Sequence, residues 1–249
     1  MQSLHDMLIT SELLHETSEK LTFSTDGRIE VENLVFPDNV TSVGRNAYYY
    51  NAKLKQVTFH DAITSISDNA FDGCRSLTTI NFSNSIKQIN SKAFQSCTSL
   101  ESLSINIPDC TISTNAFAYC SKLKSVSLNC KKVPGNLFPY CTQISTITLG
   151  NNVETICENG YSISTSKNLY SIDIPNSVTL IGNEAFSGCS NLSVAYIGTG
   201  VTSIGKRAFA ETKLVHIYYR GTMAQWESIE KGENWSSNLS YQMHYNYKG

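Results

Sequence analysis

The stretch SDNAFDGCRSLTTI, residues 67–80, combines an Ala-Phe pair, a cysteine three residues after the phenylalanine, and a leucine three residues after the cysteine. The same arrangement recurs along the chain around eight anchor aromatics: Tyr48, Phe71, Phe94, Phe117, Phe138, Tyr161, Phe186 and Phe209. Their successive spacings are 23, 23, 23, 21, 23, 25 and 23 residues. A repeat of nearly constant period is typical of a solenoid, in which each repeat forms one coil and stacks on the next.

Each repeat contains two short apolar segments. In residues 77–83, side chains expected to point inward alternate with side chains expected to point outward, which is the pattern of a strand with one buried face. The inward set is Leu77, Ile80 and Phe82, and the outward set is Thr79, Asn81 and Ser83. The second segment, such as residues 201–209, is predicted to form a returning and less regular side. A coil of this size cannot bury its apolar face alone, so neighbouring coils must stack.

The residues VTLIGNEAFSGCSNLSVAYIGTGVTSIGKRAFAETKL, 178–214, resemble the BspA-like leucine-rich repeat family. The family pattern is similar to I-G-x-x-A-F-x-x-C-x-x-L-x-x-I-x-I-P-x-x-V, and the resemblance covers about residues 31–220. The segment IYYRGTMAQWESI, 217–229, is similar to the end segment of bacterial members. The fifth and sixth repeats depart from the pattern, with NLF and NGY in place of Ala-Phe.

This resemblance implies an α/β repeat solenoid. The implied architecture is a right-handed coil of the leucine-rich-repeat type, with a parallel β-sheet on its concave face. Such solenoids are used for binding, often at a cell surface or as part of an adhesin, and the resemblance implies no catalytic residues.

Three parts of the chain are predicted. Residues 1–30 are expected to form a short N-terminal helix and cap, because apolar residues recur near helical spacing before an Asp-Gly hairpin turn at 26–27. Residues 31–220 form the solenoid of about eight repeats. Residues 221–249 are expected to form a C-terminal helix/strand cap, with Trp226 and Ile229 facing inward.

Five of the eight cysteines share one position of the repeat, three residues after the anchor aromatic: Cys74, Cys97, Cys120, Cys141 and Cys189. Equal positions in stacked coils lie a strand spacing apart, about 4.7–4.9 Å. Free cysteine is among the most buried residue types. We therefore interpret the five residues as a ladder of small buried thiols.

Disulfides between coils and a metal site are the alternatives for these thiols. Both fit badly, because no C-x-x-C pair occurs and other repeats place different residues at this position: Asn51, Ser164 and Thr212. Cys110, Cys130 and Cys157 lie off the ladder, and spacing does not decide whether they pair.

The net charge and the absence of known motifs argue against several classes of function. Nineteen basic and 21 acidic residues give a formal net charge of −2, which provides no long-range attraction for nucleic acid. No stretch approaches the roughly 20 apolar residues of a membrane span. Catalytic motifs, metal-ligand spacing and cofactor-binding loops are absent from the sequence. The histidines are scattered and are interpreted as surface residues: His5, His15, His60, His216 and His244.

Binding is expected on the outward-facing strand positions. Their middle part is polar and uncharged, which also fits a hydrated surface without a partner. The C-terminal quarter differs, because aromatic and arginine side chains, the types that anchor interfaces, gather near the tail YQMHYNY, 241–247. Some of these tyrosines must instead close the core. The predicted contact site consists of Tyr196, Tyr218, Arg220, His216 and Asp173.

Two function classes follow. The first is a non-enzymatic binding or adhesion module of a bacterial cell-surface or secreted protein, which recognises a protein or glycan partner through its strand face. The second is a structural or assembly protein that docks or oligomerises through residues 1–20. The resemblance favours the first class. The chain shows no signal peptide, which leaves a cytoplasmic or particle-associated location open.

Overall fold

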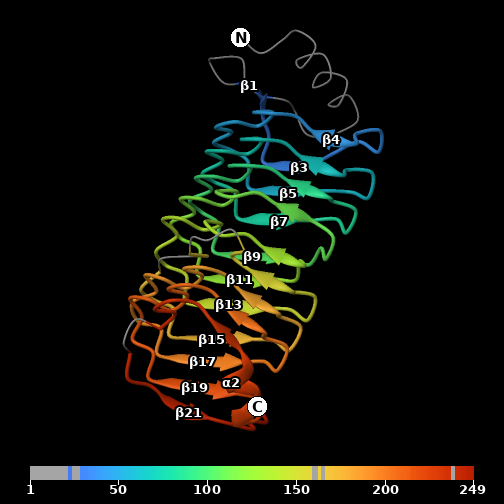
Figure 1. The fold of residues 1–249 in the computed structure, drawn as a ribbon. Coiled ribbons are helices and arrows are strands. Elements are labelled where there is room, and N and C mark those ends of the chain that lie inside the picture. Colours follow the sequence, from blue (N-terminus) through green and yellow to red (C-terminus); the bar gives the residue numbers. More distant parts are fainter. Residues whose placement is uncertain (1–21, 24–28, 159–161, 164–165, 237–238) are drawn as a thin grey trace.

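Parallel strands stack along one side of a column of coils (Figure 1). The structure is a computed structural model and describes residues 22–23, 29–158, 162–163, 166–236 and 239–249. This side is called the strand face, and its strands are β3 (Asn33–Val35), β5 (Gln56–Thr58), β7 (Thr79–Asn81), β9 (Ser102–Ile105), β11 (Ser125–Leu128), β13 (Thr146–Leu149), β15 (Ser171–Ile174), β17 (Val194–Ile197), β19 (His216–Tyr219) and β21 (Gln242–His244).

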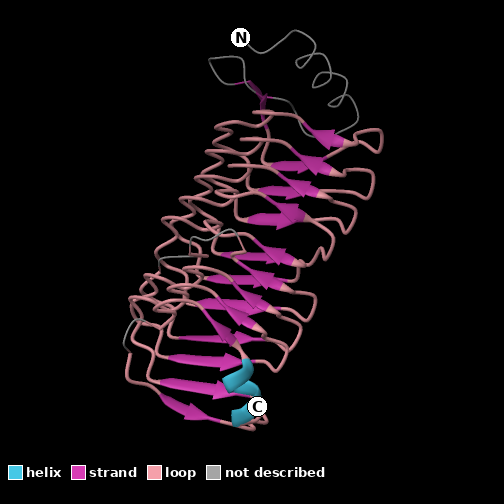
Figure 2. Ribbon diagram, viewed as in Figure 1, coloured by secondary structure: helices cyan, strands magenta, loops and turns pink. Residues whose placement is uncertain are grey.

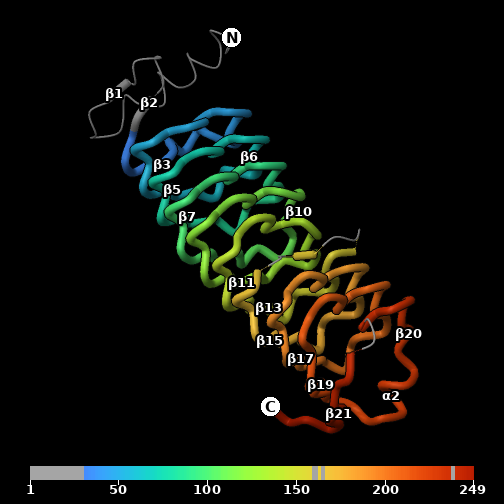
Figure 3. The backbone as a smooth tube through the Cα atoms, turned by 90° about the vertical axis from the view of Figure 1, so that its left-hand side faces the viewer, coloured from blue at the N-terminus to red at the C-terminus, as the bar shows by residue number. Residues whose placement is uncertain are grey.

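A second ladder of two-residue strands follows the returning segment. It consists of β4 (Ser42–Val43), β6 (Ser65–Ile66), β8 (Gln88–Ile89), β10 (Thr111–Ile112), β12 (Lys132–Val133), β14 (Thr155–Ile156), β16 (Leu180–Ile181), β18 (Ser203–Ile204) and β20 (Glu230–Lys231). The turn segments that contain the anchor aromatics also bond between coils. Phe71 N donates to Ala93 O at 2.7 Å, and Phe94 N donates to Ala116 O at 2.8 Å. Hydrogen bonds therefore join successive coils on three sides. Figure 3 shows the stacked coils as a tube through the backbone.

The described residues contain almost no helix, so they form a parallel β-solenoid and the predicted α/β class is wrong in this respect (Figure 2). Within the described residues, the helix is α2 (Met223–Ser228). The physical reason lies in the turn segments, which carry left-handed residues four positions apart. Asn69 has φ 55° and Gly73 has φ 77°, and a right-handed helix cannot continue through such residues.

The C-terminal segment continues the solenoid. β20 pairs in parallel with β18, and β21 pairs in parallel with β19. Residues 221–249 thus add to both ladders, and the structure does not support a separate helix/strand cap. Trp226 is buried as expected, with its ring 5.3 Å from that of Tyr219 and 5.9 Å from that of Trp235.

The predicted N-terminal helix and the oligomerisation segment, residues 1–20, lie outside the described residues. β1 (Thr22–Phe23) and β2 (Ile29–Glu30) pair antiparallel, as the predicted hairpin requires. The Asp-Gly turn itself lies outside the described residues.

The ladders are interrupted at three places in the described chain: between β7 and β9, between β13 and β15, and between β10 and β12. The β10/β12 gap coincides with the 21-residue step between anchors, and the β13/β15 gap with the 25-residue repeat. Coil length alone does not decide the pairing, because β11 pairs with β13 across the short step and β14 pairs with β16 across the long one.

The anchor aromatics from Tyr48 to Phe138, and the later pair Phe186 and Phe209, stack inside the column as predicted. The ring centroids of Phe71 and Phe94 lie 5.0 Å apart, and those of Phe94 and Phe117 lie 5.2 Å apart, with almost parallel planes. All three side chains are fully buried. The predicted outward position of Ser83 is wrong. Its side chain is buried, and Ser83 Oγ donates to Asp61 Oδ1 at 2.7 Å.

The cysteine ladder is present, and all eight thiols are free and buried. Each ladder thiol in the first half donates to the backbone carbonyl of the preceding anchor aromatic. Cys74 Sγ lies 3.1 Å from Tyr48 O, Cys97 Sγ 3.5 Å from Phe71 O, Cys120 Sγ 3.4 Å from Phe94 O and Cys141 Sγ 3.1 Å from Phe117 O. The thiols therefore act as small core groups that also satisfy a carbonyl.

Other repeats fill the cysteine position with polar residues that find internal partners. Asn51 Oδ1 accepts from Leu54 N at 3.1 Å, and Thr212 Oγ1 donates to Phe209 O at 2.9 Å. Ser164 was aligned here from sequence and lies outside the described residues. Ser166, three residues before Leu169, is buried and donates to Ile144 O at 2.6 Å. The two-residue insertion of this repeat explains the shifted position.

Close stacking gives one glycine a steric role that can be tested. A Cβ at Gly182 would overlap the backbone carbonyl of Cys157, whereas a Cβ at Gly44, which occupies the same repeat position, would meet nothing within 4 Å. Gly182→Ala is expected to lower the free energy of unfolding by about 1–3 kcal/mol, because the coil must shift to relieve the contact. Gly44→Ala is expected to be neutral or slightly stabilising. Urea unfolding followed by circular dichroism measures both, and equal effects would contradict the stacking explanation.

Candidate functional site

Most of the strand face is a polar, uncharged surface. β9, β11 and β13 pair in register, so that Ser104, Ser127 and Thr148 lie side by side. At the ends of these strands, Asn129 Nδ2 donates to Asn106 Oδ1 at 2.6 Å. At this edge of the middle coils, the asparagine side chains therefore bond to one another.

The C-terminal quarter of the strand face carries a continuous column of aromatic rings. Register places Tyr196 of β17 beside Tyr218 of β19, and Tyr218 beside His244 of β21. The rings of Tyr196 and Tyr218 stack at 5.1 Å, and those of Tyr218 and His244 stack at 4.3 Å. Tyr247 lies 5.2 Å from Tyr196 and 5.1 Å from Tyr218. We call Tyr196, Tyr218, His244 and Tyr247 the aromatic column.

His216, the first residue of β19, adds an imidazole ring to the aromatic column. Its ring lies 6.1 Å from that of Tyr218, and its Nδ1 lies 3.3 Å from His244 Nε2. The imidazoles therefore form a hydrogen-bonded pair across β19 and β21. This contact fixes the orientation of His244 against Tyr218.

An ion pair borders the column on the side of β15. Arg220 Nη2 lies 2.9 Å from Asp173 Oδ2, and Arg220 Nη1 donates to Ile174 O at 3.3 Å. The arginine side chain is 19% exposed and the aspartate side chain 60%. A pair this exposed contributes at most about 1 kcal/mol to stability, so its main effect is to hold Arg220 in place.

A hollow of about 560 Å³ lies beside this ion pair, at the gap between β13 and β15. Its lining includes Thr148, Asn176 and the Asp173–Arg220 pair. The hollow gives the arginine an open side on which a partner group could approach. An interface anchor of this kind combines a positioned charge with neighbouring aromatic area.

The surroundings of Tyr196 keep its phenol neutral. Partial desolvation, followed by the proximity of Tyr247, Tyr218 and Asp173, raises the pKa of Tyr196 above its ordinary value of 10.0. The hydroxyl therefore stays protonated at neutral pH and can donate a hydrogen bond. Each ring thus offers apolar area and one polar contact, which suits an interface.

The five residues predicted as the contact site lie on adjacent strands. Tyr196, Tyr218 and His216 form one cluster, and the Asp173–Arg220 pair borders it. Two members of the aromatic column, His244 and Tyr247, were missed because the tail was expected to be a cap. The tyrosine-rich composition of residues 241–247 was the available signal. Binding by these residues stays a prediction.

Neither a metal site nor a membrane-spanning helix is found among the described residues. Across residues 22–23, 29–158, 162–163, 166–236 and 239–249, no group of three or more His, Cys, Asp and Glu side chains is placed to share a metal ion. In the same ranges, no helix has the length and apolar character needed to cross a bilayer.

The repeat pattern matches a known family. The model of the BspA type leucine rich repeat region matches residues 22–142 and 111–230, in six copies. The chain belongs to this family. BspA-type repeats generally form non-enzymatic scaffolds. The matched residues extend from β1 to β20 and include all five predicted contact residues.

Three solved structures are similar to this BspA-type chain. A leucine-rich repeat protein from Bacteroides ovatus ATCC 8483 has 17% identity and a TM-score of 0.44, over 93% of this chain and 90% of the other. A leucine rich cell surface protein from Faecalibacterium prausnitzii A2-165 has 22% identity and a TM-score of 0.34, over 80% and 76%. Pneumococcal vaccine antigen PcpA has 16% identity and a TM-score of 0.46, over 94% of this chain and 49% of its own.

No curated protein matches the sequence significantly. Because the three TM-scores are below 0.5, the assignment to the BspA-type family rests on the repeat match alone.

Proposed function

We propose that this BspA-type chain is a non-enzymatic adhesion module that binds a protein partner through its strand face, with the aromatic column as the anchor. The observation that supports this is the stack of Tyr196, Tyr218 and His244 on a sheet whose other outward positions are mostly Ser, Thr and Asn. Solubility alone does not account for a run of aromatic rings on an outer surface. Tyrosine side chains are enriched in protein interfaces.

The module is proposed to act at the cell surface. Family membership supports this location, because BspA-type repeats often occur in surface adhesins. Antibody labelling of intact source cells is expected to detect the protein without permeabilisation. Labelling that requires permeabilised cells would contradict the proposed location. It would not bear on binding by the strand face, which the following experiment tests separately.

The binding test uses a panel of purified extracellular-matrix and cell-surface proteins on a biolayer interferometer. The wild-type chain is expected to bind at least one of them. The double variant Tyr196→Ser and Tyr218→Ser is expected to weaken that binding about 30-fold or more, because interface anchors contribute roughly 2 kcal/mol or more each. The fold is expected to persist, since Ser104 and Ser127 occupy the same strand position in other coils.

Tyr170→Ser is the matched control. Tyr170 is exposed and lies next to β15, outside the aromatic column. Its replacement is expected to leave binding unchanged. No binding to any member of the panel, or equal binding by the double variant and the wild type, would count against the proposal.

A further inference from the structure

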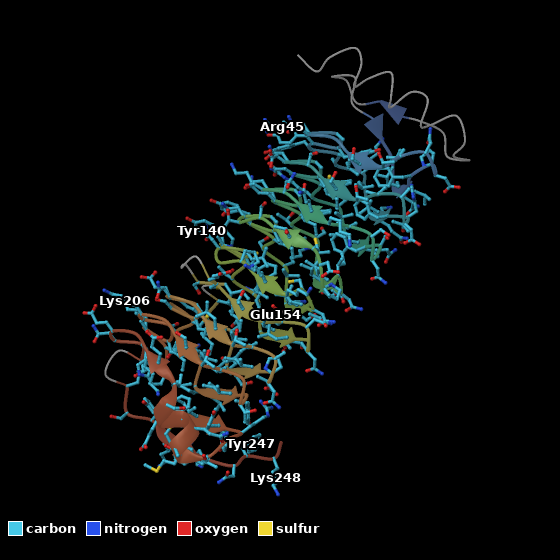
Figure 4. The ribbon with its side chains drawn as sticks, turned by 45° about the vertical axis from the view of Figure 1, so that its right-hand side comes forward. Arg45, Tyr140, Glu154, Lys206, Tyr247 and Lys248 are labelled. Atoms are coloured by element: carbon cyan, nitrogen blue, oxygen red, sulfur yellow. The ribbon has the colours of Figure 1, made fainter. Side chains whose placement is uncertain are left out.

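The turn segments form a side of the column distinct from the strand face, and two tyrosines stand out on it. The rings of Tyr119 and Tyr140 stack at 4.5 Å with an angle of 10° between their planes. Tyr119 is 46% exposed and Tyr140 is 61% exposed. In Figure 4, Tyr140 lies on the same edge of the column as Arg45 and Lys206, away from Tyr247. This pair is separate from the aromatic column.

The backbone at both tyrosines is left-handed, which makes their presence informative. Tyr119 has φ 60° and Tyr140 has φ 63°. The same repeat position holds glycine in two other coils, Gly73 with φ 77° and Gly188 with φ 80°. Bulky residues are uncommon in this region, whereas glycine adopts it without steric cost. Neither local conformation nor core burial explains why tyrosine stands here.

A hollow of about 590 Å³ lies against the tyrosine pair, a size within the range of small-ligand sites. We call it the turn hollow. Besides the tyrosines, its polar lining includes Lys92, Gln95, Asn115, Asn136, Glu184 and Glu211. Asn136 Nδ2 donates to Asn115 Oδ1 at 3.1 Å, which orients both amides at the wall.

The charge of the turn hollow is nearly balanced. Glu184 lies 3.8 Å and Glu211 2.9 Å from the guanidinium of Arg207. Lys92 is the lining residue that carries a positive charge, and the same lining holds the carboxylates of Glu184 and Glu211. The hollow therefore has no cluster of uncompensated cations, which a sulfated or phosphorylated ligand would require.

We propose that the turn hollow binds a neutral carbohydrate chain. A pyranose ring presents a face of C–H groups that packs on an exposed tyrosine ring, and its hydroxyls are both donors and acceptors. Amide and carboxylate side chains such as Asn136 and Glu184 match those hydroxyls. A peptide would instead need apolar pockets for its side chains, and apart from the tyrosines the lining holds five amide or carboxylate side chains against two apolar ones, Ala118 and Pro139.

The test is affinity electrophoresis in native gels that contain a soluble β-glucan, a galactomannan or an arabinoxylan, with heparin as the anionic comparison. The wild-type chain is expected to be retarded by at least one neutral polysaccharide. The double variant Tyr119→Gly and Tyr140→Gly is expected to lose at least tenfold in apparent affinity. Because glycine occupies this position in two other coils, the double variant is expected to fold.

Tyr50→Gly is the matched control, since Tyr50 has the same left-handed backbone (φ 57°) and is exposed, but does not line the turn hollow. Its retardation is expected to equal that of the wild type. If the glycine double variant does not fold, Tyr140→Ser replaces it, because Ser96 occupies this position elsewhere. Tyr140→Ser is also expected to reduce retardation.

Several outcomes would overturn the proposal. These are no retardation by any of the three neutral polysaccharides, retardation by heparin alone, or unchanged retardation of the tyrosine variants. Binding of an arrayed peptide at the tyrosine pair without polysaccharide binding would assign the hollow to another class of ligand. The double variant Tyr196→Ser and Tyr218→Ser is expected to be retarded by the polysaccharide as strongly as the wild type. A failure of strand-face binding can therefore be distinguished from a failure of the turn hollow.

Discussion

Replacing Phe94 by alanine is expected to lower the free energy of unfolding by about 3–5 kcal/mol. The ring of Phe94 lies between those of Phe71 and Phe117, at 5.0 and 5.2 Å, and also meets Phe82 edge-on at 5.8 Å. Its side chain is fully buried, so truncation leaves a cavity that the neighbouring coils cannot fill without breaking their hydrogen bonds. Urea unfolding followed by circular dichroism measures the loss.

Ser104→Ala is the control for this experiment. Ser104 lies on the exposed side of β9, in the same repeat as Phe94, and its replacement is expected to change the free energy of unfolding by less than about 0.5 kcal/mol. A loss below about 1 kcal/mol for Phe94→Ala would show that the aromatic ladder does not carry the core.

Raising the pH above about 9 is expected to unfold the protein, because the buried thiols resist ionisation. Burial raises the pKa of Cys74 from its ordinary value of 9.0 to about 12, and the pKa of Cys189 likewise to about 12. Burial, reinforced by Cys74, also raises the pKa of Cys97 well above its ordinary value. These thiols can lose their protons readily only in the unfolded chain.

The sign of the effect follows from proton linkage. Between the unfolded pKa near 9 and the folded pKa near 12, the folded state holds a proton that the unfolded state has released, so stability falls as the pH rises. Each such thiol removes up to about 1.4 kcal/mol per pH unit. Several thiols acting together exhaust a typical stability of about 5–15 kcal/mol within one to three pH units. Below pH 8 the same thiols leave stability unchanged.

Circular dichroism against pH is expected to show cooperative unfolding between about pH 9 and 12. A variant in which Cys74, Cys97 and Cys120 are replaced by alanine is expected to have a shallower alkaline slope, measured as the change in urea midpoint per pH unit. Stability that stays flat from pH 8 to pH 11 would contradict the burial of these thiols.

Thiol labelling gives an independent measure of the same property. At pH 8, a chromogenic disulfide reagent is expected to react with the native thiols far more slowly than with the urea-unfolded chain, because all eight cysteines are buried. Fast labelling of native Cys97 would show that the ladder opens to solvent.

The coil and its core could be predicted from the sequence because the repeat is local and regular. The 23-residue period, the anchor aromatics and the shared cysteine position all fall at equal intervals. Stacking of the coils then places equivalent repeat positions next to one another, so no other long-range contact has to be predicted. Phe71, Phe94 and Phe117 meet for this reason, and so do the ladder thiols with the carbonyls of the preceding anchors.

The continuation of both ladders through residues 221–249 was the part of the fold that the sequence did not reveal. The N-terminal pattern falls outside the described residues, and the C-terminal pattern yields the six-residue α2 within a segment that extends both ladders. Apolar spacing over a short window fits a helix and a turn equally well. The outcome depended on the open edges of β18 and β19, which offer hydrogen bonds to any following strand.

Residue types and their spacing therefore determined the period, the buried aromatic and thiol ladders, and the part of the strand face where aromatic side chains gather. Only the tertiary structure decided that His244 and Tyr247 join Tyr196 and Tyr218, that Arg220 reaches back to Asp173, and that Tyr119 and Tyr140 stack beside a hollow. The physical reason is that a repeat fixes which positions are neighbours. The changes in coil length, the pairing of the last strand and the left-handed turns fix where those side chains lie in space.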